Sequence, residues 1–321
     1  MGNPKAELAQ LPYLYGDTPT FLGFPKKKPA ELTDEDVVIL GIPWEGTITW
    51  GSWSGCELAP RTIRQASARY SGFLPEYALQ IQEHLRAADL GDVLVDMADR
   101  EKTFAHIEEA VAQAFSPGRL LTLFGGDHSI TYPVIRSLSR RLSLGIVHLD
   151  AHLDNLDSYD GDPYARNTPF RRIAELPAFN PRNLVHVGIR GPRNRREQWE
   201  FAKEAGATVF TMEDIRQRGW LTALEEAIAI AADGVDGLYV SVCSDVLEAA
   251  LNPGGPPDPG GLTPFELFQG LYRLGQVPSL VAFDYVEIYP PQDPQQISSH
   301  IAVWAWHHLL AGRIRGRMAR P

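Results

Sequence analysis

The chain has 321 residues, of which 44% are hydrophobic and 22% are charged, and its formal net charge is −10. This composition is typical of one large globular domain, and the negative charge argues against nucleic acid or an anionic membrane as a partner. The sequence contains no run of 18 apolar residues, and we expect no signal peptide. Only two cysteines are present, Cys56 and Cys243, so we expect no disulfide framework and a cytoplasmic location.

Residues 1–35 show no sustained periodicity and are repeatedly interrupted by proline and glycine. We interpret them as an N-terminal extended arm that lies on a neighbouring subunit or on the chain's own surface. Residues 36–321 contain no internal repeat and no linker, which predicts a single domain. Expected strands alternate with expected helices along this range, which predicts an α/β fold with a parallel sheet. Strands are expected at 37–42, 120–124, 144–149, 184–189, 207–211, 237–242 and 283–288, and helices near 61, at 221–232 and at 301–310.

The loop at 44–60 follows the first expected strand and combines tryptophan with glycine. Trp44, Trp50 and Trp53 stand among three glycines. A buried core position is the more common explanation for any one tryptophan. Three in a glycine-rich loop at a strand end indicate an aromatic wall over a crevice, so Trp50 and Trp53 are candidate substrate-binding residues.

Residues 120–154 form the stretch around which the rest of the chain is arranged. Two apolar runs of strand length, 120–124 and 144–149, flank a Gly-Gly turn and about a dozen residues of helical pattern. This is the length of one βαβ unit, and each run ends in Asp and His. In an open parallel sheet, ligands bind at the carboxyl ends of the strands.

Four of these polar residues are candidate metal ligands: His128, Asp150, His152 and Asp154. If the second strand persists, the last three alternate and project to one side. Mixed imidazole and carboxylate ligation suits Mn, Zn, Ni or Fe rather than Ca. The alternative is that the aspartates cap helices and the histidines lie in the core, but four desolvated polar groups at one edge are costly without a shared cation.

The segments Gly125-Gly126-Asp127-His128-Ser129 and Asp150-Ala151-His152-Leu153-Asp154 resemble the first two signatures of the ureohydrolases, the arginase and agmatinase family. The resemblance runs from about Val37 to the last expected helix. It implies a three-layer α/β/α fold with a central parallel sheet. It also implies two divalent transition metal ions per subunit, Mn or Ni, and a bridging hydroxide that attacks a guanidinium carbon and releases urea.

The sequence departs from the family after the strand expected at 237–242. The family has Asp-x-Asp there, with the first aspartate bridging the two metals, whereas this chain has Cys243 followed by Ser244 and Asp245. Asp245 is therefore a candidate ligand and Cys243 a doubtful one. A thiolate is a softer ligand and would favour Zn or Ni over Mn.

Two further positions concern the substrate. Agmatinase-like members carry His-Gly-Thr before Pro-Phe, where this chain has Arg166-Asn167-Thr168. Arginine cannot shuttle protons, so Arg166 is either a surface guanidinium or a substrate-binding residue. Glu287 matches the glutamate that the family uses to hold the substrate guanidinium. Asp154 and Glu287 are the catalytic candidates.

Two hypotheses for the function remain open. The first is a C–N hydrolase of a small cationic guanidine-type substrate, such as agmatine or an alkylated guanidine or biguanide. The second is a degenerate subunit that supports an intact ureohydrolase, since heteromeric members such as the metformin hydrolases show that the family permits this pairing. In either case the resemblance implies a homo- or hetero-oligomer, a trimer or hexamer.

Overall fold

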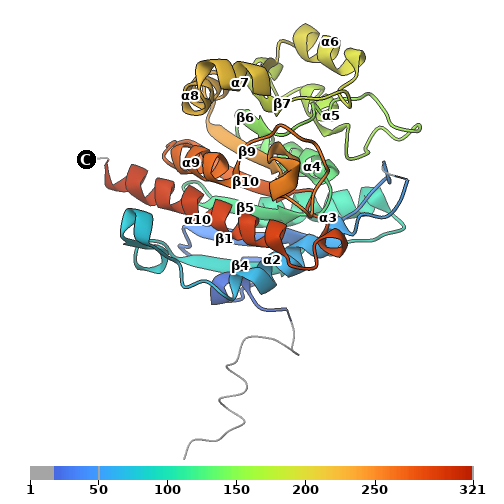
Figure 1. The fold of residues 1–321 in the computed structure, drawn as a ribbon. Helices are drawn as coiled ribbons and strands as arrows, with labels where there is room; N and C mark the ends of the chain where they lie inside the picture. Colours follow the sequence, from blue (N-terminus) through green and yellow to red (C-terminus); the bar gives the residue numbers. More distant parts are fainter. Residues whose placement is uncertain (1–17, 50, 320–321) are drawn as a thin grey trace, which may run out of the picture.

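The structure is a computed structural model, and it describes residues 18–49 and 51–319. A parallel eight-stranded sheet with the order β4-β1-β5-β10-β9-β6-β7-β8 forms its centre (Figure 1). The strands are β1 (Val37–Ile42), β4 (Ala87–Asp92), β5 (Leu120–Gly125), β6 (Leu144–Leu149), β7 (Leu184–Ile189), β8 (Thr208–Thr211), β9 (Gly237–Cys243) and β10 (Leu280–Val286). A short antiparallel hairpin joins β2 (Phe73–Leu74) to β3 (Leu79–Gln80).

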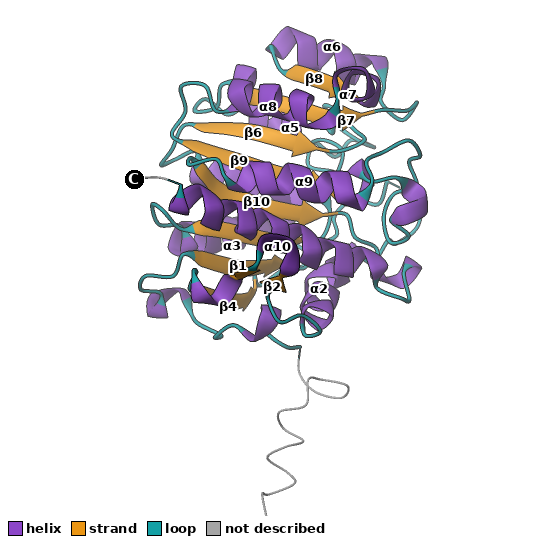
Figure 2. Ribbon diagram, turned by 60° about the vertical axis from the view of Figure 1, so that its left-hand side comes forward, coloured by secondary structure: helices purple, strands orange, loops and turns teal. Residues whose placement is uncertain are grey.

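Helices cover both faces of the sheet, which makes three layers (Figure 2). One layer holds α2 (Ala59–Ser67), α8 (Trp220–Ala231), α9 (Pro264–Gly275) and α10 (Ile297–Met318). The other holds α3 (Arg100–Ala114), α4 (Thr131–Leu138) and α5 (Pro169–Ala174), while α6 (Arg196–Ala205) and α7 (Met212–Arg218) lie near β8. The three-layer α/β/α fold expected from the sequence is confirmed.

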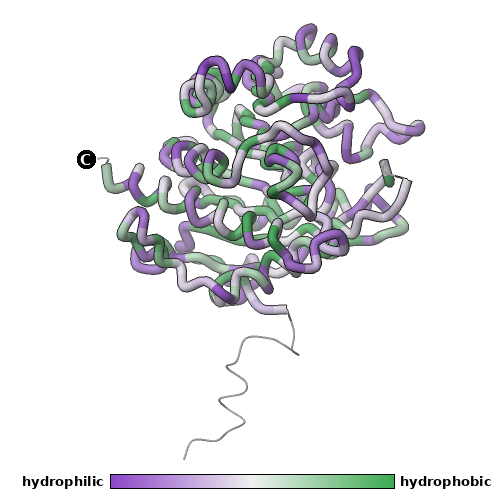
Figure 3. Tube along the Cα trace, viewed as in Figure 1, coloured by the Kyte–Doolittle hydropathy of each residue, from purple (hydrophilic) through white to green (hydrophobic). Residues whose placement is uncertain are grey.

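Two apolar cores lie between the sheet and its helix layers. Residues of β1, β5, β6, β9 and β10 are buried on both faces of the sheet, as continuous apolar runs predict for parallel strands. Hydrophobic segments follow these central strands, whereas hydrophilic segments lie on the outer helices (Figure 3). Among the described residues, no helix has both the length and the apolar character needed to cross a bilayer.

Most strand boundaries follow the apolar runs of the sequence. The strands at 37–42, 144–149 and 184–189 begin and end where expected, but β10 ends at Val286, so Glu287 lies beyond the strand. The C-terminal helix is longer than expected, at 22 residues. The strand β4 was missed because Asp89 and Gly91 interrupt its apolar pattern.

The described part of the N-terminal segment, residues 18–35, lies on the chain's own body. Phe21 is completely buried, and its ring centroid lies 4.9 Å from those of Phe124 and Trp306. Its backbone N–H donates to Asp89 Oδ2 at 2.7 Å. Residues 18–35 are therefore held by the domain, while residues 1–17 of the expected arm lie outside the described residues.

Candidate metal centre and active site

The register of the central strands brings their carboxyl ends to one edge of the sheet. Val286 of β10 pairs with Cys243 of β9, and Leu149 of β6 pairs with Val242. The residues that follow these strand ends therefore lie side by side. Asp245 and Glu287 line the same pocket in this way, from β9 and β10, and Asp150 follows β6 at the same edge of the sheet.

The Gly125-Gly126 turn after β5 allows a close approach of three backbone segments. A Cβ atom on Gly126 would lie 1.8 Å from the carbonyl oxygen of Trp44, and Gly126 O accepts a hydrogen bond from the backbone N–H of Glu287 at 2.9 Å. Asp127 then caps the short 3₁₀ helix His128–Ile130, because its side chain accepts from Ser129 N at 2.9 Å. His128 is thereby placed beside the end of β6.

Asp150 lies at the centre of two overlapping groups of potential metal ligands. His128, Asp150 and Cys243 offer ligand atoms within 4.8 Å of one another, and so do Asp150, His152 and Asp245. His128 Nδ1 lies 3.1 Å from Asp150 Oδ2 and 3.0 Å from Asp154 Oδ2. The five ligands expected from the sequence and the doubtful Cys243 are thus brought together.

The protonation of His128 provides a test of whether a cation fits these residues. Ser241 Oγ donates to Asp284 Oδ1 at 2.7 Å, so it accepts from His128 Nε2, which lies 3.0 Å away. In neutral His128 the lone pair is then on Nδ1, directed at two carboxylates, and this buried atom has no hydrogen-bond partner. A shared cation removes this repulsion, so the donor set fits a divalent metal.

The closely packed carboxylates of this cluster also shift the pKa values of His128 and Cys243. Burial by itself would lower the pKa of His128, but the nearby carboxylates of Asp150 and Asp154 outweigh burial and hold that pKa well above its usual value. Burial raises the pKa of the Cys243 thiol, and the surrounding carboxylates, with Asp150 the largest, raise it further. Without a cation, the thiol is therefore protonated at neutral pH.

The second imidazole, His152, lies between three carboxylates. Its Nδ1 is 2.9 Å from Asp245 Oδ2 and 3.4 Å from Asp150 Oδ1, and its Nε2 is 3.4 Å from Asp258 Oδ2. Asp258 was not singled out in the sequence, because it lies in a proline- and glycine-rich loop far from any strand end. A carboxylate on the outer nitrogen is the usual means of orienting a metal-binding imidazole.

Asp150, His152 and Asp154 converge in a different way from that expected. Strand β6 ends at Leu149, so these residues do not alternate along a strand. They converge in an irregular segment in which Asp154 adopts a left-handed backbone with φ 43°. Glu287 also has a positive φ, 61°. Such strain in side-chain-bearing residues is concentrated at functional sites, and no sequence pattern signals it.

Arg166 is buried rather than on the surface, with 4% of its area exposed. Its Nη1 lies 3.0 Å from Glu287 Oε2, and its Nη2 lies 2.8 Å from Glu45 Oε1. Tyr289 OH also donates to Glu287 Oε2 at 2.6 Å, and His128 N donates to Glu287 Oε1 at 2.8 Å. Both oxygens of Glu287 are therefore engaged by donors of the chain itself.

The pKa of Glu287 depends on its ion pair with Arg166. Burial raises the pKa of Glu287 to about 7, and the positive charge of Arg166 opposes that rise. Glu45, the second partner of Arg166, was missed in the sequence, although it follows the end of β1 by only three residues. Because β1 is parallel to the other strands, its carboxyl end lies at the same edge of the sheet, and this would have identified Glu45 as a candidate.

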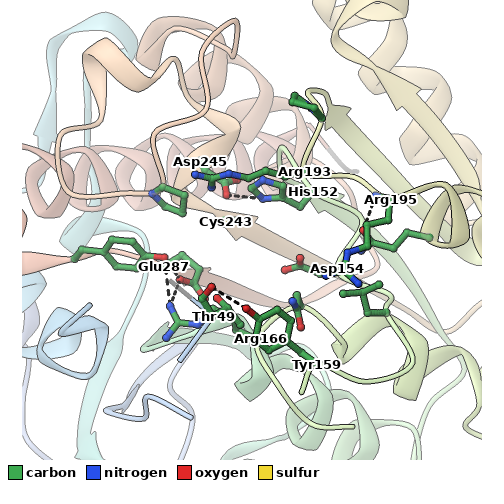
Figure 4. A pocket seen from close by; sticks show the side chains of 16 residues that line it. Thr49, His152, Asp154, Tyr159, Arg166, Arg193, Arg195, Cys243, Asp245 and Glu287 are labelled. Atoms are coloured by element: carbon green, nitrogen blue, oxygen red, sulfur yellow. Dashed lines mark hydrogen bonds and ion pairs between the residues drawn. The ribbon is translucent and has the colours of Figure 1, made fainter. Parts of the chain in front are cut away.

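A pocket of about 360 Å³ opens over these groups (Figure 4). Cys243, Asp245, His152, Asp154, Glu287 and Arg166 line its inner part, and Arg193 and Arg195 lie on the side of His152 and Asp154. Thr49, Tyr159, Asn167, Gln198 and Tyr289 are also among its lining residues.

The expected aromatic wall is not found among the described residues. Trp53 is 54% exposed, donates through its indole N–H to Glu57 at 2.9 Å, and is absent from the described residues that line the pocket. Trp44 is buried and packs edge-on against Phe104. Trp50 lies outside the described residues. Glycine allows the backbone of this loop to follow many paths. The direction of the indole rings could therefore not be predicted from the sequence.

Comparison with known proteins places this geometry in a family. A family model described as "Arginase family" matches residues 35–312. Guanidinopropionase of Pseudomonas aeruginosa is 36% identical over 293 residues, which cover 89% of this chain and 88% of that protein. Formimidoylglutamase of Halalkalibacterium halodurans is 34% identical over 270 residues, with 83% of each chain covered.

The fold is also that of a solved structure. The crystal structure of formimidoylglutamase from Bacillus subtilis superposes with a TM-score of 0.87 at 27% identity, and the match covers 98% of this chain and 99% of that one. The family model spans the whole sheet and every candidate ligand. The chain belongs to the arginase family.

Proposed function

We propose that the chain is a metal-dependent hydrolase that cleaves a C–N bond of a small guanidino compound and releases urea or a substituted urea. The observation that carries this proposal is the position of Asp150, which belongs to two ligand groups at the floor of a pocket that also contains Glu287. Relatives named for guanidino compounds, such as the guanidinopropionase above, support the same reaction class.

The ligands that we propose are His128, Asp150, His152, Asp154 and Asp245, with Cys243 as a sixth. They suit two divalent ions, Mn or Ni, and the sulfur of Cys243 adds Zn to the candidates. When bound, such ions lower the pKa of water and so supply a hydroxide at neutral pH.

Glu287 would orient the substrate, and Asp154 would transfer a proton. Glu287 lines the pocket, and its Oε1, which accepts from His128 N, has a second lone pair that would accept a hydrogen bond from a substrate N–H and so orient the reacting carbon. Burial raises the pKa of the Asp154 carboxyl, with the neighbouring Asp150 charge adding to it, and Asp154 also lines the pocket, so we assign to it the transfer of a proton to the leaving nitrogen. Water and the guanidino compound then give urea and an amine.

A direct experiment tests this reaction class. The chain is loaded with Mn²⁺ or Ni²⁺, and urea release is measured from agmatine, arginine, 3-guanidinopropanoate and 4-guanidinobutanoate, with a chelator-treated sample beside it. We expect urea from at least one compound and loss of turnover on chelation. A metal-loaded chain that releases no urea from any of them contradicts the proposal.

The second candidate, a supporting subunit of a heteromeric ureohydrolase, is favoured by one specific contact. Arg166 engages the carboxylate that the resemblance assigns to the substrate. In that case the chain alone would stay silent and free of metal, and activity would appear only with an intact partner chain. Metal content of the purified chain separates the two candidates.

We also propose that the chain forms an oligomer. Several large apolar side chains are exposed on the hairpin and on α9 and α10, namely Phe73, Phe265 and Trp304. Phe73 and Trp304 line the same surface pocket, and exposed apolar groups that lie close together are typical of subunit interfaces. Light scattering at micromolar concentration tests this, and a monomer mass would contradict it.

A further inference from the structure

Two buried histidines, His148 and His186, lie behind the candidate metal centre and have no part in the reaction proposed above. They face each other across the neighbouring strands β6 and β7, and both side chains are completely buried. His148 Nδ1 lies 2.8 Å from His186 Nδ1, and His148 Nε2 lies 2.9 Å from Asp150 Oδ2. The three side chains thus form one chain of hydrogen bonds, which ends on the carboxylate shared by both ligand groups.

The available acceptors determine where the protons of this hydrogen-bond chain lie. An ionised Asp150 carboxylate only accepts, so His148 Nε2 carries a proton and donates to it. His186 Nε2 is buried and has no hydrogen-bond partner among the described residues, so the proton of this ring is on Nδ1. His186 Nδ1–H therefore donates to His148 Nδ1, and both rings are neutral.

Each oxygen of Asp150 has one hydrogen-bond donor and lies beside one imidazole of the candidate metal centre. Oδ2 accepts from His148 Nε2 and lies 3.1 Å from His128 Nδ1. Oδ1 accepts from the backbone N–H of His152 at 2.6 Å and lies 3.4 Å from His152 Nδ1. A carboxylate oxygen has two lone pairs, so each oxygen keeps one lone pair for a cation.

Aromatic packing holds the His148 ring and keeps water away from it. The ring of Phe170 is completely buried, and its centroid lies 3.9 Å from that of His148 and 5.4 Å from that of His186. The His128 ring packs edge-on against both His148 and Phe170. A hydrogen bond to a carboxylate is stronger in such surroundings than in water, and solvent cannot replace a donor that is lost there.

We propose that His148 and His186 are positioning residues that act through Asp150, holding its Oδ2 so that the carboxylate offers one oxygen to each of two cations. This inference rests on the metal centre of the proposed function and adds the residues that keep it able to hold two ions. The backbone N–H of His152 holds Oδ1 independently. Loss of the histidine pair should therefore weaken the metal position beside His128 and spare the one beside His152.

The test is Mn²⁺ binding to the metal-free chain, measured by titration calorimetry and by the electron paramagnetic resonance of bound Mn²⁺, neither of which requires turnover. The unmodified chain should bind two ions and give the signal of an exchange-coupled pair. His148→Leu removes the donor to Asp150 Oδ2 and should weaken one of the two positions by about tenfold or more, so that isolated ions dominate the signal at low Mn²⁺. His186→Leu should act in the same direction with a smaller effect.

Conservative variants separate positioning from packing. Glutamine carries an amide N–H near the place of histidine Nε2, and asparagine carries one near the place of Nδ1. His148→Gln and His186→Asn should therefore recover part of the affinity that the leucine variants lose. The control is His307→Leu, which removes another buried imidazole, on α10 and outside both ligand groups, and should leave both positions unchanged.

The possible outcomes separate this inference from the proposed function. Two ions bound by His148→Leu with unchanged affinities overturn the inference and leave the hydrolase proposal standing. The same holds if the leucine and glutamine variants lose affinity equally, because the effect would then come from packing.

A chain that binds no Mn²⁺ contradicts the proposed function instead, and the imidazole ¹⁵N chemical shifts of the metal-free chain then decide the inference. Protons on His148 Nε2 and His186 Nδ1 support it. A proton on His186 Nε2 overturns it, because His186 would then not donate to His148 from a neutral ring.

Discussion

Arg166 Nη1 lies 3.0 Å from Glu287 Oε2, so a guanidinium of the chain itself contacts the carboxylate that faces the pocket. Both side chains are almost completely buried, and Glu45 holds the other end of the guanidinium. A buried pair of this kind contributes most clearly through the cost of removing one partner.

Arg166→Met should destabilise the protein by about 3 kcal/mol or more at pH 8, because Glu287 and Glu45 lose their cation in a buried setting. Urea denaturation measures this, and Arg166→Met with Glu287→Gln should recover part of the loss. Arg218→Met, at an exposed pair, is the control and should cost less than about 1 kcal/mol. A loss of stability in Arg166→Met as small as that of the control would contradict this prediction. It would mean that water replaces the contacts of Arg166 with both carboxylates.

Asp150→Asn should lose metal binding at both ligand groups, because Asp150 is the residue that they share. Metal content after dialysis against Mn²⁺, followed by gel filtration, measures this. Asp157→Asn, which removes a carboxylate that is 74% exposed on the same segment, should keep the metal content of the unmodified chain. Equal content in the two variants would contradict the assignment of Asp150.

Gly126→Ala should destabilise the protein by about 3 kcal/mol or more, since its Cβ would lie 1.8 Å from Trp44 O and must displace backbone. Gly118→Ala provides the comparison: Gly118 has φ 82° but no atom within 4 Å of the added Cβ. Gly118→Ala should lower the stability by about 1 kcal/mol, because alanine is disfavoured in the left-handed backbone conformation. Thermal unfolding of the two variants measures the difference, and equal losses would contradict the packing argument.

His307 should make stability depend on pH below neutrality. Burial lowers the pKa of His307 to about 4, with the neighbouring His308 adding to this effect and the hydrogen bond to Val303 O opposing it. Tyr70 and Trp306 pack against the ring. Between pH 6.5 and about 4 the unfolded chain therefore binds the proton and the folded chain does not, so stability falls as pH falls, by up to about 3 kcal/mol.

His307→Gln should remove this part of the pH dependence when the free energy of unfolding is measured between pH 7 and pH 4.5. His84→Gln, at an exposed position, should leave it in place. An unchanged slope in His307→Gln would mean that other groups carry the acid sensitivity.

Much of the candidate site follows from one rule about parallel sheets. Apolar runs located β5, β6 and β9, and polar residues just past their ends converge because the strands are parallel and in register. The positions of His128, Asp150, His152 and Asp245 could therefore be predicted from the sequence. The same rule applied to β1 would also have found Glu45.

The rest depended on contacts that a sequence does not reveal. Burial of Arg166 requires Glu45, Glu287 and Tyr289, which come from two distant segments. Asp154 reaches the cluster through a left-handed backbone with φ 43°, which is uncommon for residues other than glycine. The direction of Trp53 depends on the path of a glycine-rich loop, for which local pattern gives no preference.

The most direct test of the central claim is the rate of urea release by the Mn²⁺-loaded chain and by Asp150→Asn under the same conditions, with 4-guanidinobutanoate as substrate. We expect turnover well above the rate in Mn²⁺ alone for the unmodified chain, and only the background rate for Asp150→Asn. A rate that is equal in the two proteins would contradict catalysis at a metal centre built on Asp150.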